Sequence, residues 1–138
     1  EETESYVRKL ISRSEAPTGH YWMIRHKKDG KIIGTFGLLD IDPRKGSCEI
    51  GYGISPRYWG KGYFKEALRM VLEHLFGEAG FHRVWAKTQD DNVASIKSLE
   101  SIGFKPEGSL RDFYLSEKDG VRHDAVVMAI LGQEFSAG

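Results

Sequence analysis

The sequence has almost no cysteine, no excess of either charge and no long apolar run. Its one cysteine, Cys48, excludes an internal disulfide and is typical of a small core residue in a reducing compartment. The 20 basic and 20 acidic side chains cancel, so the overall charge does not favour a nucleic acid or membrane partner, and any basic site must be local. No apolar run approaches the roughly 18 residues of a membrane span, and the acidic start at residues 1–4 does not resemble a signal peptide. These absences predict a soluble, cytoplasmic protein.

Histidine and tryptophan are present, but without a pattern that indicates a metal or a nucleic acid. The five histidines are scattered and no two stand at the spacing of metal ligands, so we predict no bound metal. The three tryptophans lack a basic stripe beside them, which favours core or pocket-rim positions over base stacking. The 138 residues contain no repeat, low-complexity segment or linker, so a single domain over residues 1–138 is expected.

Apolar periodicity and turn residues predict a chain of mixed strands and helices. The strongest signal is an apolar stripe of period 3.6 over residues 61–76, which predicts a long amphipathic helix. Three antiparallel strands are expected before this helix, and the order strand, helix, strand around it implies a parallel crossover. The expected elements are a short helix at 6–11, strands at 21–25, 31–39 and 47–54, the helix at 61–76, a strand at 82–88, a helix at 93–102, and strands at 104–117 and 121–131.

The stretch of residues 49–63 is a strand-like run that breaks into a glycine-rich, basic turn and then becomes the long helix. Gly60 and Gly62 allow the backbone to approach a ligand where a Cβ atom would clash, and Arg57 and Lys61 add positive charge. The first N–H groups of a helix have no intrahelical partner, and the helix dipole is positive at that end. Together these features predict a binding site for an anion such as a phosphate group.

Two known nucleotide-binding loops can be excluded by spacing. A P-loop would require glycine where Ser55 stands and serine or threonine where Gly62 stands. A dinucleotide fingerprint would require a third glycine at the position of Lys65. The stretch therefore matches neither loop.

Three short motifs occur in a fixed order along the rest of the chain. Arg-x-x-Gly-x-Gly at residues 57–62 opens the long helix, and it is followed by Asn-x-x-Ser at residues 92–95 and Gly-Phe-x-x-Glu-Gly at residues 103–108. The chain thereby resembles the GNAT superfamily of N-acetyltransferases, whose acetyl-CoA loop reads Gln/Arg-x-x-Gly-x-Gly/Ala. More narrowly it is similar to the ribosomal-protein N-acetyltransferase (RimJ/RimL-like) branch, in which the second and third motifs also occur. The resemblance covers residues 32 to the end.

The resemblance implies an α/β (α+β) fold with a mixed, mostly antiparallel sheet, a splayed central parallel pair of strands and flanking helices. It also implies that the family's first strand and helix have no counterpart here, because the short helix expected at 6–11 looks like the family's second helix. Acetyl-CoA is the implied co-substrate, its pantetheine arm lying along the strand before the loop and its pyrophosphate in the loop. The residues implied to bind it are Gly53, Ile54, Arg57, Trp59, Gly60, Lys61, Gly62, Tyr63, Asn92 and Ser95.

The resemblance places the chemistry on the same strand. Acetyl transfer requires a neutral amine, and Glu49 is the candidate base, with Asp40 as a weaker alternative. The other reading of Glu49 is a solvated carboxylate at a strand edge. Ser95 is the candidate acid that protonates the departing thiolate, with Tyr114 or Tyr52 as fallbacks. A backbone N–H near Tyr52 or the glycine after it is expected to stabilise the oxyanion.

Position 99 departs from the superfamily pattern. Leu99 stands where many members carry a tyrosine proposed to protonate the thiolate, although the ribosomal-protein branch commonly lacks that tyrosine too.

We expect an acetyl-CoA-dependent N-acetyltransferase that acts by direct transfer in a ternary complex on a protein N-terminal amine or a small primary amine. An antibiotic or polyamine acetyltransferase and a non-catalytic CoA-binding or interaction module stay open as alternatives. A homodimer also stays open.

Overall fold

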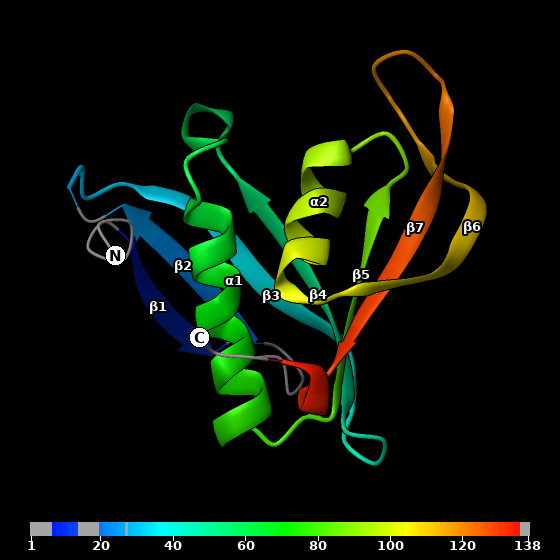
Figure 1. Ribbon diagram of the computed structural model, residues 1–138. Helices are drawn as coiled ribbons and strands as arrows, with labels where there is room; N and C mark the ends of the chain where they lie inside the picture. The colour runs from blue at the N-terminus through cyan, green and yellow to red at the C-terminus, as the bar shows by residue number, and fades with distance from the viewer. Residues whose placement is uncertain (1–6, 14–19, 27, 136–138) are drawn as a thin grey trace.

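The computed structural model describes residues 7–13, 20–26 and 28–135. Within them a seven-stranded mixed sheet has the strand order β1-β2-β3-β4-β5-β7-β6, and the helices α1 and α2 lie side by side on one of its faces (Figure 1). The strands are β1 (Val7–Arg13), β2 (His20–His26), β3 (Ile32–Asp42), β4 (Ser47–Ile54), β5 (Arg83–Gln89), β6 (Lys105–Leu115) and β7 (Arg122–Leu131). The helices are α1 (Tyr63–Glu73) and α2 (Val93–Ile102).

One pair of neighbouring strands in this sheet is parallel, and it is also the shortest pairing. β4 and β5 pair in parallel only from Ser47 opposite Arg83 to Glu49 opposite Trp85, whereas every other neighbouring pair is antiparallel. Beyond Glu49 the remaining residues of β4 keep their pairing with β3 alone, and the two strands diverge toward the top of Figure 1. The predicted mixed sheet with a splayed central parallel pair is confirmed.

The core lies between the sheet and the two helices. The apolar stripe of α1 buries Ala67, Leu68, Val71 and Leu72 against the sheet, as its period of 3.6 predicts. The helix begins at Tyr63, two residues later than predicted, because Gly62 before it has a left-handed φ of 82°. At its other end the chain continues past the glycine at position 77 as a π-helical turn, His74–Glu78. The predicted end at residue 76 is therefore two residues short.

The first predicted element is wrong. Residues 7–13 form the strand β1, which pairs with β2 over its whole length, so four strands precede the glycine-rich loop instead of three. A short apolar run does not distinguish a helix from a strand, and here the backbone pairing with β2 decides. The match between this segment and the family's second helix is wrong for the same reason. Residue 6, which belongs to the predicted helix, lies outside the described residues.

The other predicted elements are confirmed. β4 and α2 have the predicted bounds, and Gly103 follows α2 as the expected C-terminal glycine, with a φ of 123°. Cys48 is fully buried in the core, and this burial raises the pKa of its thiol to about 12. Among the described residues no helix is long and apolar enough to span a membrane.

Candidate active site

A cleft of about 420 Å³ opens where β4 leaves β5. It lies between the end of β4, the glycine-rich loop with the start of α1, and the start of α2. The cleft therefore brings together the three segments that the sequence motifs single out: the end of β4, the glycine-rich loop, and the start of α2. The lining residues are Tyr52, Gly53, Ile54, Tyr58, Trp59, Gly60, Gly62, Tyr63, Phe64, Lys65, Asn92, Ala94, Ser95 and Ser98.

The loop between β4 and α1 forms one end of this cleft. It begins with a short 3₁₀ turn, Pro56–Tyr58, and Trp59 then donates from its indole Nε1 to the carbonyl oxygen of Ile54 at 2.9 Å. Gly60 has a left-handed φ of 76°, like the glycine at the start of α1, so the chain can turn sharply into the helix. The N–H groups of the first turn of α1 have no intrahelical partner. This end of the cleft is suited to an anion.

Two side chains attach the loop to the hairpin between β2 and β3. The Tyr58 hydroxyl donates to a carboxylate oxygen of Asp29 at 2.9 Å, and the Tyr63 hydroxyl lies 3.0 Å from Nε2 of His26. The rings of Tyr58 and Tyr63 also pack against His26 at 5.1 Å between centroids. The loop therefore has fixed support on the side away from α2.

Two glycines near the cleft differ in whether contacts within the protein leave room for a Cβ atom. A Cβ atom on Gly34 would lie 2.5 Å from the carbonyl oxygen of Gly53, so β3 requires glycine there to pack against β4. A Cβ atom on Gly53 would meet no atom of the described residues within 4 Å, and Gly53 has no left-handed φ. The protein's own packing gives no reason for glycine at position 53. A ligand that approaches the strand closely would give one.

The start of α2 joins the cleft through Asn92 and Ser95. Asn92 caps the helix, its side-chain oxygen accepting from the backbone N–H of Ser95 at 3.2 Å. The Ser95 hydroxyl lies 2.6 Å from the Tyr52 hydroxyl. Burial raises the pKa of Tyr52 above its ordinary value, and the hydrogen bond to Ser95, together with the nearby Thr88 side chain on β5, opposes that rise. Two neutral hydroxyl groups therefore meet at the wall of the cleft.

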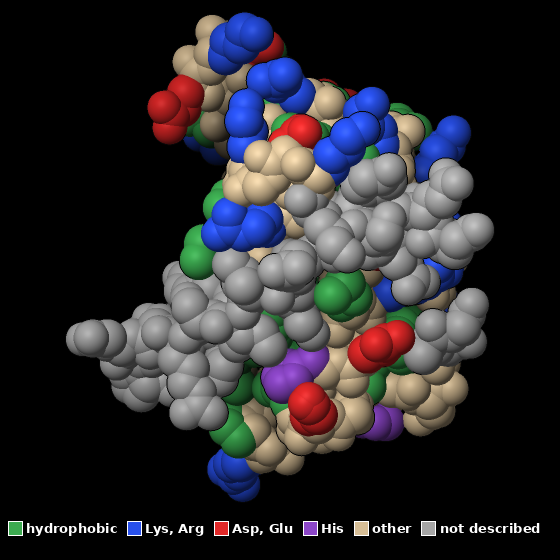
Figure 2. Space-filling model, turned by 90° about the vertical axis from the view of Figure 1, so that its left-hand side faces the viewer, with side chains coloured by type: hydrophobic (Ala, Val, Ile, Leu, Met, Phe, Trp, Pro, Cys, Tyr) green, Lys and Arg blue, Asp and Glu red, His purple; other side chains and the backbone are tan. Residues whose placement is uncertain are grey.

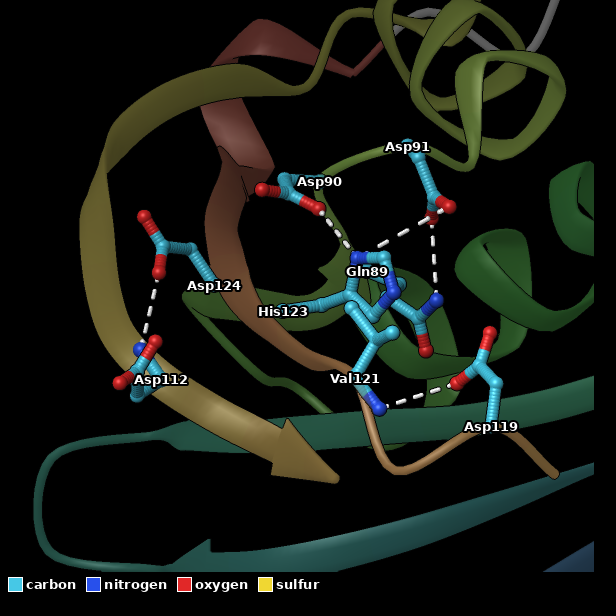
Figure 3. A network of polar contacts seen from close by, with 8 residues as sticks. All are labelled: Gln89, Asp90, Asp91, Asp112, Asp119, Val121, His123 and Asp124. Atoms are coloured by element: carbon cyan, nitrogen blue, oxygen red, sulfur yellow. Dashed lines mark hydrogen bonds and ion pairs between the residues drawn. The ribbon is translucent and has the colours of Figure 1, made fainter. Parts of the chain in front are cut away.

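The loop that leads into α2 is held by a network of polar contacts from β7 (Figure 3). Nδ1 of His123 lies 3.2 Å from Asp90 and 3.8 Å from Asp91, and Gln89 donates to Asp91 at 3.0 Å. These two carboxylates and the imidazole are close enough together to hold a cation. The sequence spacing of the histidines did not indicate this cluster, because residues 90 and 123 are brought together only by the pairing of β5 with β7. The absence of a metal stays a prediction.

Glu49 lies on the other face of the sheet. Successive side chains of a strand point to opposite faces, and Cys48 and Ile50 are in the core under the helices, so Glu49 points away from the helices and from the cleft. It is only 6% exposed, and the reading of Glu49 as a solvated edge carboxylate is wrong because β4 is an interior strand. Burial raises the pKa of Glu49, while the Lys87 ammonium, 3.5 Å from its carboxylate, opposes the rise.

The weaker candidates for the base and the acid, Asp40 and Tyr114, both lie near Glu49. Asp40 has a left-handed φ of 45°, is exposed, and acts on Glu49 only through its charge. Tyr114 on β6 is half-buried and close enough to both Glu49 and Tyr52 for their charges to raise its pKa, although burial is the largest cause. Leu99 is fully buried in the core, so that position carries no acid.

Most of the residues implied to bind acetyl-CoA line the cleft. Two do not: Arg57 is exposed on the 3₁₀ turn, and Lys61 lines a smaller hollow next to the cleft. Sequence reasoning missed Lys65 and Ser98 in particular. Ser98 lies one helical turn after Ser95, so the spacing of the Asn-x-x-Ser motif offered a signal for it. No pattern in the sequence indicates a binding role for Lys65, which stands where a dinucleotide fingerprint would require glycine.

The sequence profile of the acetyltransferase (GNAT) domain family matches residues 1–105. The chain belongs to the GNAT acetyltransferase family. The match begins at residue 1, so it includes β1 and β2, which the resemblance starting at residue 32 left out. The glycine loop and the Asn-x-x-Ser helix of this GNAT domain both lie within the matched region.

Relatives and solved structures agree with this assignment. An uncharacterised N-acetyltransferase, p20 of Bacillus licheniformis, is 34% identical over 110 residues, which are 80% of this chain and 61% of p20. A putative ribosomal N-acetyltransferase of Bacillus subtilis, YdaF, is 33% identical over 78% of this chain and 57% of its own length. The chain thus spans about 60% of the length of these relatives.

The fold is shared with solved GNAT structures. A chimera of the spermidine N-acetyltransferase SpeG from Vibrio cholerae and hSSAT superimposes with a TM-score of 0.78, at 22% identity, over 86% of this chain and 69% of that chain. At this identity the likeness concerns the fold, and it confirms the predicted fold class.

Proposed function

We propose that this GNAT domain is an acetyl-CoA-dependent N-acetyltransferase that acts on a primary amine by direct transfer in a ternary complex. The observation that carries the proposal is the split between β4 and β5. A glycine-lined cleft with the Tyr52–Ser95 pair opens on one face of the sheet there, and the Glu49 carboxylate is buried on the other face. This arrangement lets donor and acceptor reach the same break in the sheet from opposite sides.

The cleft suits the pantetheine and pyrophosphate parts of CoA. Beyond Glu49, none of the described residues pairs with β4 on the side of β5, so its backbone can pair with the amides of an extended ligand. Side chains at Gly53 and Gly60 would project into space that the protein does not fill. In Figure 2, Lys and Arg side chains gather on the upper part of the visible face, the end that carries both the β4–α1 loop and the β6–β7 hairpin in Figure 1. At the loop and the start of α1, Lys65 lines the cleft and Arg57 is exposed. That local charge favours a phosphate ligand.

The acetyl thioester supplies the acyl group, and residues of this chain move the protons. Glu49 takes the proton that the amine loses as its nitrogen bonds to the acetyl carbon, directly or through water. As the carbon–sulfur bond breaks, the hydroxyl of Ser95 or Tyr52 donates a proton to the sulfur. A backbone N–H near Tyr52 or Gly53 donates to the carbonyl oxygen while that oxygen carries negative charge.

The acceptor that we propose is a protein N-terminal α-amine. Such an amine titrates near ~7.7–8.0 and a lysine-like amine near ~10.4, so the α-amine needs far less help to become neutral at pH 7. A single buried carboxylate is sufficient for that task. The Asn-x-x-Ser and Gly-Phe-x-x-Glu-Gly motifs, and the name of the relative YdaF, also support the ribosomal-protein branch. A polyamine or antibiotic amine is the alternative acceptor.

The test is CoA thiol release from acetyl-CoA with a panel of amines. The panel holds peptides with a free N-terminus, the same peptides with a blocked N-terminus and one lysine, spermidine, and an aminoglycoside. We expect turnover of the free N-terminal peptides only, and a kcat at least a hundredfold lower for Glu49→Gln, the usual scale for loss of a general base. Lys45→Met, on the exposed turn before β4, is the control and should match the wild type.

Two outcomes would contradict parts of this proposal. Turnover of spermidine or the aminoglycoside without any peptide turnover would exclude the N-terminal acceptor. Tight CoA binding without turnover of any amine would exclude the enzyme and favour a non-catalytic CoA-binding module.

A further inference from the structure

The contact between Lys87 and Glu49 joins the two strands at the point where they separate. Lys87 Nζ lies 3.5 Å from Oε2 of Glu49, and both side chains are largely buried, at 22% and 7% exposure. We infer that Lys87 is the positioning residue of Glu49, holding its carboxylate in place and ionised on the acceptor side of the sheet. The base role of Glu49 rests on the proposed function, whereas the contact and its effect on the carboxylate do not.

The surroundings of Glu49 would otherwise disfavour a negative charge. Burial penalises the ionised carboxylate, and Asp40 on β3 adds a charge of the same sign. Tyr114 on β6 faces the site as a neutral phenol, since its pKa is raised above the ordinary value. The helices pack on the opposite face. Among the described residues, Lys87 is therefore the group that supplies opposite charge to Glu49.

The Lys87 ammonium is itself held between aromatic rings. It lies 4.6 Å from the ring centroid of Phe113 on β6 and 5.6 Å from that of Trp85 on β5. Aromatic faces attract a cation, and their apolar bulk limits the access of water to it. Trp85 is also the residue directly opposite Glu49 in the last pair of the parallel ladder. The ammonium is thus held by residues of two strands beside the carboxylate.

This geometry has a definite consequence for pH dependence. Removing the Lys87 charge leaves burial and Asp40, both of which raise the pKa of Glu49. Glu49 would then take up a proton at a higher pH, and less of the ionised base would be present at neutral pH. The acidic limb of the activity profile would move upward by the same amount.

The direct test is a titration of Glu49 by NMR in the full chain, with ¹³C-labelled glutamate carboxylates and Glu49→Gln for assignment. We expect Lys87→Met, which keeps the aliphatic stem beside the rings, to raise the Glu49 midpoint by about one pH unit. Lys87→Arg should restore most of the wild-type midpoint, and Lys45→Met should leave it unchanged. Lys87→Gln replaces Lys87→Met if the latter does not fold. A midpoint that stays or falls in the neutral variant overturns the inference.

The activity arm separates this inference from the proposed function. With an amine that the wild type acetylates, Lys87→Met should shift the acidic limb of kcat/KM upward by the same unit, with KM for acetyl-CoA unchanged and kcat recovering at high pH. An acidic limb that stays in place while the NMR midpoint moves overturns the role of Lys87 in catalysis. A shifted midpoint in a protein that acetylates no amine supports the Lys87–Glu49 contact and contradicts the proposed function alone.

Discussion

The hydroxyl of Tyr52 on β4 lies 2.6 Å from the hydroxyl of Ser95 on α2. This hydrogen bond crosses from the diverging strand to the helix at the wall of the cleft. The phenol of Tyr52 therefore joins β4 to α2 beside the split. The same phenol stands where the proposed reaction needs a proton donor for the departing sulfur.

Tyr52→Phe removes this hydroxyl and keeps the aromatic ring, so it tests the hydroxyl alone. The ring packs against Phe36 and Phe64, with centroids at 5.9 Å and 4.8 Å, and phenylalanine keeps that packing. We expect the free energy of unfolding to fall by about 1 kcal/mol, the usual value of one hydrogen bond. We expect kcat to fall about a hundredfold, the low end for loss of a general acid, with CoA affinity unchanged. Urea unfolding, thiol release and calorimetric titration with CoA measure the three quantities.

The matched control for this prediction is a double-mutant cycle with Ser95→Ala. If the two hydroxyls act through their shared hydrogen bond, the double variant should lose little more activity than either single variant. Fully additive losses would show two independent roles. Unchanged kcat in all three variants would remove both residues from the list of acid candidates.

Gly53→Ala should weaken CoA binding without affecting the fold. Within the part of the chain that the structure describes, the new Cβ atom would meet no atom within 4 Å, so the free energy of unfolding should change by less than about 0.5 kcal/mol. In the proposed complex the same atom projects toward the ligand, and we expect the Kd for CoA to rise at least tenfold. Gly77→Ala is the control, because its Cβ also meets nothing and it lies in the π-helical turn away from the cleft. Equal CoA affinity in both variants would contradict a ligand at Gly53.

Trp59 should report CoA binding by its fluorescence. Its side chain is 62% exposed at the cleft and is held by the hydrogen bond from Nε1 to Ile54. We expect CoA to change the tryptophan emission, Trp59→Phe to abolish most of that change, and the affinity of this variant to fall no more than about tenfold, as for loss of one hydrogen bond. Trp85→Phe, on the other face of the sheet, should keep the signal. A full signal in Trp59→Phe would place the ligand elsewhere.

Glu107→Gln should test a pH-dependent contribution to stability. Arg83 on β5 donates two hydrogen bonds to Glu107 on β6, at 2.9 and 2.7 Å, and these bonds lower the pKa of the carboxyl. A lowered pKa means that the contribution is present above the ordinary carboxyl pKa and is lost as pH falls through the folded value. Both side chains are about one third exposed or more, so solvent screening limits the loss at pH 7 to about 0.5 kcal/mol.

Urea unfolding at pH 7 and again below about pH 4 measures this contribution. The difference between Glu107→Gln and the wild type should shrink toward zero in acid. Glu117→Gln, an exposed carboxylate near the β6–β7 turn, is the control. A difference that grows in acid would contradict the direction of the pKa shift.

Much of the fold and of the cleft could be predicted because the decisive signals are local. The stripe of α1 and the glycines at positions 60 and 62 depend on neighbours in the chain, and the structure places them within two residues of the prediction. The sequence predicts a helix where β1 lies, because a short apolar run can fit both a helix and a strand. Only the pairing of this segment with β2 decides between the two. The contact between Lys87 and Glu49 could not be predicted, because no residue pattern around Lys87 indicates Glu49 as its partner.

The sequence was enough to predict the family, the loop that turns into α1 and every element after the first, because each depends on residue types at short spacing. The residue at which β4 and β5 separate, after Glu49 opposite Trp85, follows from contacts between distant segments. That separation puts Tyr52 and Ser95 in the cleft and leaves Glu49 buried on the other face beside Lys87. The physical reason is that strand register and side-chain alternation act between segments far apart in the chain, and no local pattern encodes which residues they bring together.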